Sequence, residues 1–412
     1  MAKFSSDRFP PGFFDLPQSA GETLPLELIG EWTRSAQTHD IARAILAPHT
    51  LRGIVVSSDS AGLTRLTRER PLLEILAMVN APKELVYGHG RAIGGRSIGV
   101  WSADNSAMFY ESGIDADRVV AMLRTTMGRV AADCELGIGM AAHVGEFYEL
   151  GGGVHGPDAD RVETVAEDHT EGGELVITDD LWNALTDQSA FTVSERADLS
   201  ETFGRILRVT DGRTLDGLDV SDTAYPAPYS AGFTEGLTHY ARTRRDSMAP
   251  EQAYQDLAVV LIAREQEELD VPEVAVLNDL ALTAATKRIG ATLLRGGEGA
   301  EVKCAGLVSI YTFAECSDAI KFARSFRQEL ADQGVKCRIG IDAGPVLVFD
   351  LGPGRREIAG SPVNVASKLA EDVGEFGKIQ MTDNVSKRAG AKRERATLQF
   401  NVSGVALRAY DV

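Results

Sequence analysis

The sequence has no long apolar segment and few cysteines. No stretch approaches the roughly 20 apolar residues that a membrane-spanning helix requires, so we expect none. The N-terminal residues lack the charged-then-apolar profile of a signal peptide. The four cysteines form no CxxC pair, which excludes the common zinc and redox motifs. These observations predict a cytoplasmic protein with reduced thiols.

Basic residues are also scarce relative to acidic ones. The chain has 42 Lys and Arg against 60 Asp and Glu, a formal net charge of −18. Such a surface repels nucleic acid and anionic membranes, so we expect neither as a partner. A small anionic ligand would need a local cationic or metal-loaded pocket. With 412 residues, 44% of them hydrophobic, the chain is long enough for two globular domains.

Several familiar catalytic motifs are missing. No Ser-His-Asp or Cys-His arrangement can be identified. The glycine-rich stretch "GHGRAIGGRSIGV" (88–100) lacks the Lys-Ser/Thr ending of a phosphate-binding loop. The chemistry of this chain must therefore be sought in other patterns.

One pattern occurs twice. The segment that begins "CELGIGMAAHVGEF" at Cys134 resembles the segment that begins "CRIGIDAGPVLVF" at Cys337. Matching landmarks follow at an almost constant offset: Gly137 and Gly340, Gly156 and Gly360, Glu167 and Glu371, Gly173 and Gly377, and Thr178 and Thr382. This agreement over about fifty residues indicates a duplicated domain.

Each copy shows the same predicted order of elements. An apolar strand (53–59 and 258–264) is followed by a helix and a second strand. Another helix leads to a glycine-containing strand, a loop, a helix (157–168 and 361–373) and a closing strand. This order predicts an α+β fold, two ferredoxin-like sandwich domains with helices on one face of each sheet.

The duplication divides the chain into four parts. Residues 1–45 form a helical lead-in, and 46–210 the first domain. Residues 211–250, rich in Gly, Pro, Asp and Ser, are predicted to be a linker. Residues 251–412 form the second domain.

The stretch "EIAGSPVNVASKLAED" (357–372) places Asn364 and Lys368 four residues apart. Gly360, Ser361 and Pro362 before them are a helix-start signal. Residues i and i+4 lie on one helical face, so the amide and the cation would be neighbours. Taken alone, the pattern fits a solvated helix edge as well as a binding site.

The glycine-containing strand, the loop and the motif G-x-x-V-N-x-A-x-(basic)-L-x-E resemble the class III nucleotidyl cyclase domain. The second copy matches more closely than the first. In this family the active site lies between two such domains: one supplies two metal-binding aspartates, and the other supplies the groups that hold the base, the ribose and the phosphate. The resemblance implies two Mg²⁺ or Mn²⁺ ions and ATP or a related purine nucleotide as ligands.

The metal-binding residues occur only in the first copy. "VVSSDSAGLTRL" and "VWSADNSAMFY" put Asp59 and Asp104 at the two metal positions of the family. The second copy has Arg264 and Leu307 there, which cannot replace them. We expect substitution of Arg264 to have little effect. An Asp at the end of a strand is also a common turn former, so either residue alone is a weak signal.

The nucleotide-reading residues occur only in the second copy. Lys303 and Glu357 occupy the adenine-binding positions, where the family has Lys and Asp. Asn364 stands at the ribose-orienting position and Lys368 at the position of the catalytic Arg. The first copy has, in the same order, Val100, Gly153, Asp160 and Thr164. A structural ion pair between Lys303 and Glu357 is the alternative interpretation.

This division implies one composite site and one degenerate site, as in paired-domain adenylyl cyclases. The function that the resemblance favours is conversion of ATP to 3′,5′-cyclic AMP and pyrophosphate. Two departures favour the alternative, a catalytically silent pseudo-cyclase that binds a nucleotide or a regulatory protein partner: Lys368 replaces Arg, and Val405 stands where the family often has a phosphate-binding Lys.

Overall fold

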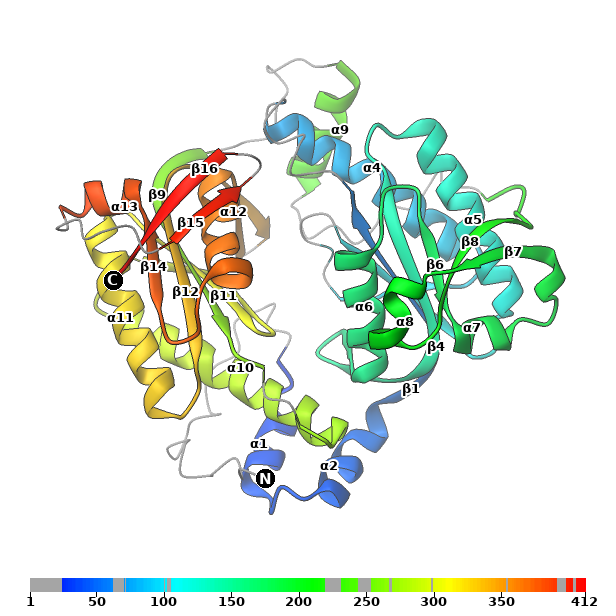
Figure 1. Ribbon diagram of the computed structural model, residues 1–412, viewed down its shortest axis with the longest axis horizontal. Coiled ribbons are helices and arrows are strands. Elements are labelled where there is room, and N and C mark those ends of the chain that lie inside the picture. The colour runs from blue at the N-terminus through cyan, green and yellow to red at the C-terminus, as the bar shows by residue number, and fades with distance from the viewer. Residues whose placement is uncertain are drawn as a thin grey trace. The chain divides into compact units, whose positions relative to one another are not determined.

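The computed structural model describes residues 24–61, 70, 72–99, 101, 105–218, 231–243, 253–266, 269–297, 299–352, 355–390, 398–402 and 405–412. It divides into two compact units. The first-repeat unit comprises residues 46–250, and the second-repeat unit comprises residues 251–412 together with the N-terminal segment up to Ile45. Each unit contains one mixed eight-stranded sheet (Figure 1).

The sheet of the first-repeat unit has the strand order β2-β3-β1-β4-β6-β8-β7, with β5 paired to β4. Its strands are β1 (Thr50–Ser60), β2 (Arg96–Ser97), β3 (Ser106–Glu111), β4 (Ile138–Leu150), β5 (Gly153–His155), β6 (Leu175–Thr178), β7 (Phe191–Glu195) and β8 (Ile206–Gly212). Its helices are α4 (Leu72–Ala92), α5 (Ala116–Asp133), α6 (Pro157–His169), α7 (Asp179–Ala184), α8 (Ala197–Phe203) and α9 (Ala231–Thr243).

The sheet of the second-repeat unit has the equivalent order β10-β11-β9-β12-β14-β16-β15, with β13 paired to β12. Its strands are β9 (Ala253–Arg264), β10 (Gly299–Ala305), β11 (Val308–Phe313), β12 (Cys337–Gly352), β13 (Arg355–Ala359), β14 (Ile379–Thr382), β15 (Leu398–Val402) and β16 (Val405–Asp411). Its helices are α1 (Leu26–Arg34), α2 (His39–Leu46), α10 (Pro272–Leu294), α11 (Cys316–Asp332), α12 (Ser361–Ser367) and α13 (Asp383–Arg388). The identical strand order agrees with the predicted tandem duplication.

Helices cover both faces of the sheet, whereas the sequence predicted helices on one face. In β1, Ile54 and Val56 belong to one buried cluster with residues of α4 and α5. Val55 between them belongs to a second cluster with residues of α6 and α8. Successive side chains of a strand point to opposite faces, so a run of apolar residues is required where both faces are covered. The run in β1 therefore reflects a sheet with a core on each side.

Strand pairing changes one part of the predicted repeat alignment. Tyr148 pairs with His155 in the β4–β5 hairpin, and Leu347 pairs with Ala359 in the β12–β13 hairpin. His143 of β4 and Asp342 of β12 then occupy equivalent places: the hydroxyl of Thr178 lies 2.8 Å from His143 Nδ1, and that of Thr382 donates to Asp342. The alignment of Gly137 with Gly340 was wrong, because the β12–β13 hairpin is longer than the β4–β5 hairpin. Ala359 follows its partner Leu347 by 12 positions, whereas His155 follows its partner Tyr148 by 7.

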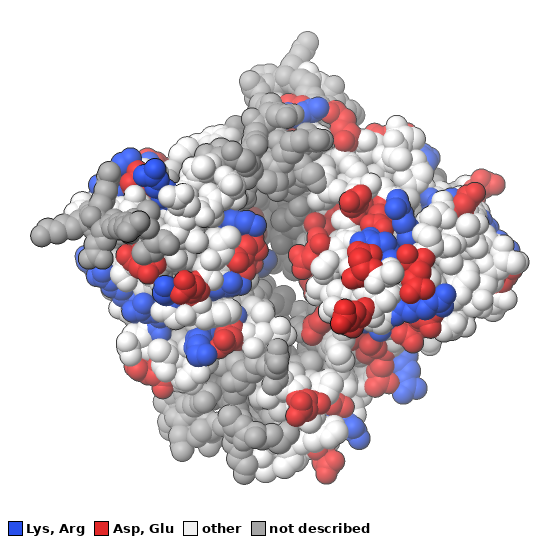
Figure 2. All heavy atoms as spheres, viewed as in Figure 1, with Lys and Arg blue, Asp and Glu red and all other residues white. Residues whose placement is uncertain are grey.

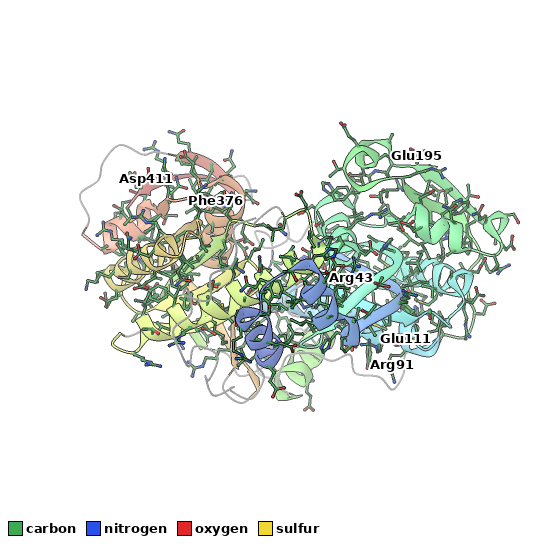
Figure 3. All side chains as sticks on the ribbon, turned by 90° about the horizontal axis from the view of Figure 1, so that it is seen from below. Arg43, Arg91, Glu111, Glu195, Phe376 and Asp411 are labelled. Carbon is green, nitrogen blue, oxygen red and sulfur yellow. The ribbon has the colours of Figure 1, made fainter. Side chains whose placement is uncertain are left out.

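The two N-terminal helices pack on α10 of the second-repeat unit. Trp32 of α1 is fully buried, and its indole Nε1 donates to Asn278 Oδ1 at 2.9 Å. Arg43 of α2, labelled in Figure 3, lies 3.5 Å from the Glu273 carboxylate at the start of α10. The chain thus contributes two helices to the second-repeat unit before it enters β1 of the first.

Part of the predicted linker is a helix. α9 packs against α4, and its residues Phe233, Leu237 and Tyr240 are buried. Their spacing of i, i+4 and i+7 is that of an apolar helical stripe. The sequence contained this signal, but the Gly- and Pro-rich residues before it dominated the prediction.

Two expectations from composition hold in the described part of the chain. The four cysteines, all described, are free thiols. No described helix combines the length and apolar content that crossing a bilayer requires.

We expect Trp32→Ala to destabilise the second-repeat unit by about 3–5 kcal/mol, because it empties a large buried volume and leaves Asn278 without its donor. Hydrogen exchange should accelerate in residues 253–412 and not in 46–218. Trp182→Ala, in α7 of the other unit, is the matched control and should show the reverse pattern. Equal acceleration in both units for Trp32→Ala would contradict the assignment of α1 to the second repeat.

Asp342 should make stability depend on pH. It is 8% exposed, and burial raises its pKa above the usual range although Thr382 donates to it. Folding therefore disfavours the ionised form, and this penalty is absent at low pH and appears as pH rises through the folded pKa. As pH rises from 4 to 8, the free energy of unfolding of Asp342→Asn should therefore increase relative to that of wild type. The increase should be about 1.4 kcal/mol for each unit by which folding raises the pKa of Asp342.

Urea unfolding across this pH range measures the effect. Asp332→Asn, which alters an exposed carboxylate of α11, should change little with pH. A relative stability of Asp342→Asn that falls with rising pH would show that the buried carboxylate is stabilised, not penalised.

Candidate nucleotide and metal site

The first predicted metal ligand lies in an open pocket of the first-repeat unit. Asp59 is near the end of β1, where it pairs with Gly139 of β4. The pocket has a volume of about 320 Å³. Its lining comes from the end of β1, the end of α6 and the loop after α6: Asp59, Ser60, Ala61, Ala166, Glu167, Thr170, Glu171 and Gly172.

Glycine at position 139 makes this pocket. A Cβ there would lie 1.9 Å from the Thr170 hydroxyl oxygen, so no larger residue permits the loop to approach β4 so closely. The loop brings Glu171 to the rim beside Glu167 of α6. Asp59 thus shares its pocket with two further carboxylates, and carboxylate oxygens are the ligands that Mg²⁺ and Mn²⁺ prefer.

The second predicted ligand, Asp104, lies outside the described residues. Within the described part of the chain, no three His, Cys, Asp or Glu side chains converge closely enough to hold a metal ion. The residues after Asp104 are nevertheless fixed near Asp59. Asn105 Nδ2 donates to Glu167 Oε1 at 3.2 Å, and the hydroxyl of Ser106 is hydrogen-bonded to that of Ser58.

The residue before this segment is fixed as well. Trp101 is 1% exposed, and its Nε1 donates to the carbonyls of Ile98 and Ala107. The buried ammonium of Lys83, on α4, donates to the Trp101 carbonyl at 3.3 Å. Sequence reasoning missed both residues; the signal was a lysine within the apolar pattern of α4.

Acidic side chains gather on α6 of the first-repeat unit. Figure 2 shows carboxylates crowded over α6 and α8, with arginines between them. The residues of α6 at the positions of Asn364 and Lys368 are Asp160 and Thr164. A helix of this charge does not suit a triphosphate.

The predicted adenine-binding residues lie on neighbouring strands of the second-repeat unit. Lys303 is on β10, which contacts β13, the strand that carries Glu357. The Lys303 side chain is exposed. A bulge between Glu301 and Lys303 interrupts the pairing with β11 and re-aims the side chains there. Glu357 is half-buried, and its carboxylate accepts from the Ile358 amide at 3.1 Å.

Asn364 and Lys368 lie one turn apart, as predicted. α12 begins at Ser361, after Gly360 with φ of 142°, and Pro362 lies in the first turn. The amide of Lys368 donates to the Asn364 carbonyl, which sets the two side chains on one face. A π-helical turn, Lys368–Val373, continues the helix. Such turns frequently occur at functional sites.

Two further features shape this helix. A Cβ at Gly340 of β12 would lie 2.2 Å from the Ala366 carbonyl oxygen, so glycine is required for α12 to lie so close to the sheet. The ammonium of Lys368 pairs with Asp372 at 2.5 Å, and its side chain remains 40% exposed. Sequence reasoning did not single out Asp372, although its i+4 spacing from Lys368 was visible.

The strand pairing moves Arg264 away from the place of Asp59. Because His143 and Asp342 are equivalent, their partners Val55 and Val259 are equivalent too. Ala263 then matches Asp59, and Arg264 matches Ser60.

Arg264 is 2% exposed, and its Nη2 lies 3.0 Å from Asp279 Oδ1, 2.9 Å from the Thr283 hydroxyl and 2.7 Å from the Gly306 carbonyl. Because truncation would remove all three contacts, we expect it to lower stability. That its substitution has little effect on turnover stays a prediction.

The C-terminal strands offer few free cations in the described residues. Val405 begins β16, and Arg408 on the same strand is exposed. In the basic stretch 387–395, Lys387 pairs with Asp383 and Arg388 pairs with Asp256. These two are thus engaged in surface ion pairs.

Comparison with known proteins adds the following. Residues 302–405 match the family model of the adenylate and guanylate cyclase catalytic domain. A search of curated protein sequences finds no match to the chain. Among solved structures, a class III adenylyl cyclase-like ATP-binding protein from Pseudomonas aeruginosa is similar over 84% of this chain and 85% of its own, with a TM-score of 0.53 and 12% identity.

Two shorter structures match part of the chain. The adenylyl cyclase CyaB from P. aeruginosa aligns with 39% of this chain and 95% of its own, with a TM-score of 0.34 and 19% identity. An adenylate/guanylate cyclase/hydrolase from Silicibacter pomeroyi aligns with 39% and 98%, with a TM-score of 0.34 and 20% identity. Residues 302–405 of the second repeat are therefore similar in sequence to the adenylate and guanylate cyclase catalytic domain, and the chain as a whole shares its fold with a class III adenylyl cyclase-like ATP-binding protein.

Proposed function

We propose that this protein binds ATP with divalent metal ions at one site to which both repeats contribute, and that it converts ATP to 3′,5′-cyclic AMP and pyrophosphate. The observation that carries the proposal is the division of residues. The first-repeat unit has Asp59 in a carboxylate-lined pocket and an acidic α6. The second-repeat unit has Lys303, Glu357, Asn364 and Lys368 on adjoining elements and, at the place of Asp59, Ala263, which cannot bind a metal.

Asp59 and Asp104 are the proposed metal ligands. Two Mg²⁺ or Mn²⁺ ions would acidify the attacking hydroxyl and neutralise the triphosphate. The carboxylates that surround Asp59 suit such ions in chemistry, and Asn105 and Ser106 hold the chain next to Asp104 close to the same pocket.

Residues of the second-repeat unit would bind the base and the ribose. The Lys303 ammonium would donate to a ring nitrogen of adenine, and the Glu357 carboxylate would accept from its 6-amino group. Guanine carries a 6-oxo group, which a carboxylate repels. Asn364 would orient the ribose, so that its 3′-oxygen faces the α-phosphate.

In the reaction, the 3′-oxygen loses its proton and bonds to the α-phosphorus, while the bond from that phosphorus to the bridging oxygen breaks and pyrophosphate leaves. Lys368 would face the charge that develops on the α-phosphate. Its pairing with Asp372 holds the ammonium in competition with the phosphate, and Lys lacks the two parallel donors of Arg. We therefore propose a slow enzyme.

The second candidate is a silent pseudo-cyclase that binds nucleotide and acts as a switch for a protein partner. The Lys368–Asp372 pair and the valine at position 405 favour it. The Pseudomonas protein of similar fold is described as adenylyl cyclase-like and ATP-binding, wording that suits either candidate.

ATP should bind more tightly than GTP in the presence of Mn²⁺, because Lys303 and Glu357 match the edge of adenine. Isothermal titration calorimetry measures both affinities. Lys303→Ala should weaken ATP binding by about tenfold, the effect of one lost charge-assisted hydrogen bond, and change GTP binding less. Lys321→Ala, which removes an exposed lysine of α11, is the control. Adenine preference that survives Lys303→Ala would contradict these base contacts.

Lys368→Arg separates the two candidates. If the site is catalytic, this substitution should raise cyclic AMP formation by about tenfold or more with little change in ATP affinity, because the contact strengthens in the transition state. Asp59→Ala should abolish turnover, and Lys321→Arg should leave it unchanged. Cyclic AMP is quantified by mass spectrometry with Mg²⁺ and with Mn²⁺. If wild type and Lys368→Arg both form none, the enzyme proposal fails and the binding switch remains.

A further inference from the structure

Arg264 is the last residue of β9 and pairs with Cys337 of β12. Its guanidinium is buried, and all three of its hydrogen-bond contacts, to Asp279, Thr283 and Gly306, come from Nη2. Nε and Nη1 have no acceptor within the described residues. A buried charge with unsatisfied donors is costly. Its position therefore calls for a specific explanation.

The contacts of Arg264 converge on one turn. Gly306 and Leu307 connect β10 to β11, and Gly306 has φ of 53°. Arg264 forms two hydrogen bonds to this turn. Its backbone amide donates to the Leu307 carbonyl at 2.9 Å, and its Nη2 donates to the Gly306 carbonyl at 2.7 Å. The Thr283 hydroxyl of α10 also donates to the Gly306 carbonyl, at 3.1 Å. The turn is thus clamped between β9 and α10.

The clamped turn lies next to the strand that carries Lys303, which is three residues before Gly306. β10 is the edge strand of its sheet, and the bulge at Lys303 weakens its pairing with β11. Two other contacts tie β10 to α10: Lys287 pairs with Glu301 at 2.9 Å, and the Cys304 thiol lies 3.9 Å from the Thr283 carbonyl. Lys303 is thus an exposed side chain on a strand whose direction depends on its attachment to α10.

We propose that Arg264 is a positioning residue for base recognition: its buried guanidinium fixes the β10–β11 turn and thereby the direction of Lys303. This inference rests on the proposed function.

The first-repeat unit uses a similar device. There the buried ammonium of Lys83 donates to the Trp101 carbonyl, in the connection between β2 and β3. In each unit a buried cation thus holds the main chain of a connection close in sequence to a predicted site residue, Asp104 in one and Lys303 in the other.

Hydrogen exchange tests the clamp without nucleotide. In the full chain, Arg264→Met should accelerate exchange of amides in residues 299–313 by about tenfold, because the turn loses a charge-assisted hydrogen bond. Thr283→Val, which is isosteric and removes one partner of the clamp, should have a smaller effect in the same segment. Arg124→Met is the control: Arg124 also binds a carbonyl and an aspartate, Thr210 and Asp211, but in the other unit.

A double-mutant cycle tests the link to Lys303. Arg264→Met should weaken ATP binding several-fold and reduce the preference for ATP over GTP, and it should have no further effect in the Lys303→Ala background. Thr283→Val should follow the same pattern. If Arg264→Met fails to fold, Thr283→Val provides both measurements.

Each outcome decides a different claim. Unchanged exchange in 299–313 for both variants overturns the clamp. Faster exchange with equal loss of ATP affinity in the presence and absence of Lys303 overturns the positioning role and leaves Arg264 as a stabilising residue. Unchanged ATP affinity on Lys303→Ala overturns the base contact of the proposed function, and with it the positioning role, even where the exchange result confirms the clamp.

Discussion

The long antiparallel ladder at the centre of each sheet is the constraint on which the candidate site depends. In the second-repeat unit β9 pairs with β12 from Arg264 opposite Cys337 to Ala253 opposite Val348. In the first-repeat unit β1 pairs with β4 in the same sense, with Asp59 near the same end. Because both faces of these strands are buried, a slip by one residue would turn every side chain to the wrong core.

The ladder assigns a place to each group of site residues. One end of the first strand carries Asp59 in the first-repeat unit and Ala263, followed by Arg264, in the second. The far end of β12 continues into the β12–β13 hairpin, which carries Glu357, and then into α12. Gly340 in the ladder lets α12 lie against the sheet, which fixes Asn364 and Lys368. Backbone pairing thus positions the functional groups, and side-chain changes at its ends distinguish the two repeats.

Side chains at equivalent places differ between the repeats. At the end of β9, Arg264 forms a buried network with α10 and the β10–β11 turn, whereas β1 ends in Asp59 and Ser60. Beneath α12 and α6, Asp342 and His143 occupy equivalent positions, and each is hydrogen-bonded to a threonine on the next strand. This buried position thus carries a carboxylate in one repeat and an imidazole in the other.

The sequence by itself determined the duplication, the α+β class, the order of elements and the helix that carries Asn364 and Lys368. These follow from local patterns: apolar runs, the Gly-Ser-Pro helix start and spacing along one chain. The tertiary structure alone decided that helices cover both faces of each sheet, that α1 and α2 pack on the second repeat, and that Lys303 is exposed while Arg264 is buried. These properties depend on contacts between residues far apart in the chain, such as Trp32 with Asn278, and on hairpin lengths that shift one repeat against the other. Composition and periodicity do not record such contacts, because burial is a property of the packed neighbours and not of the residue itself.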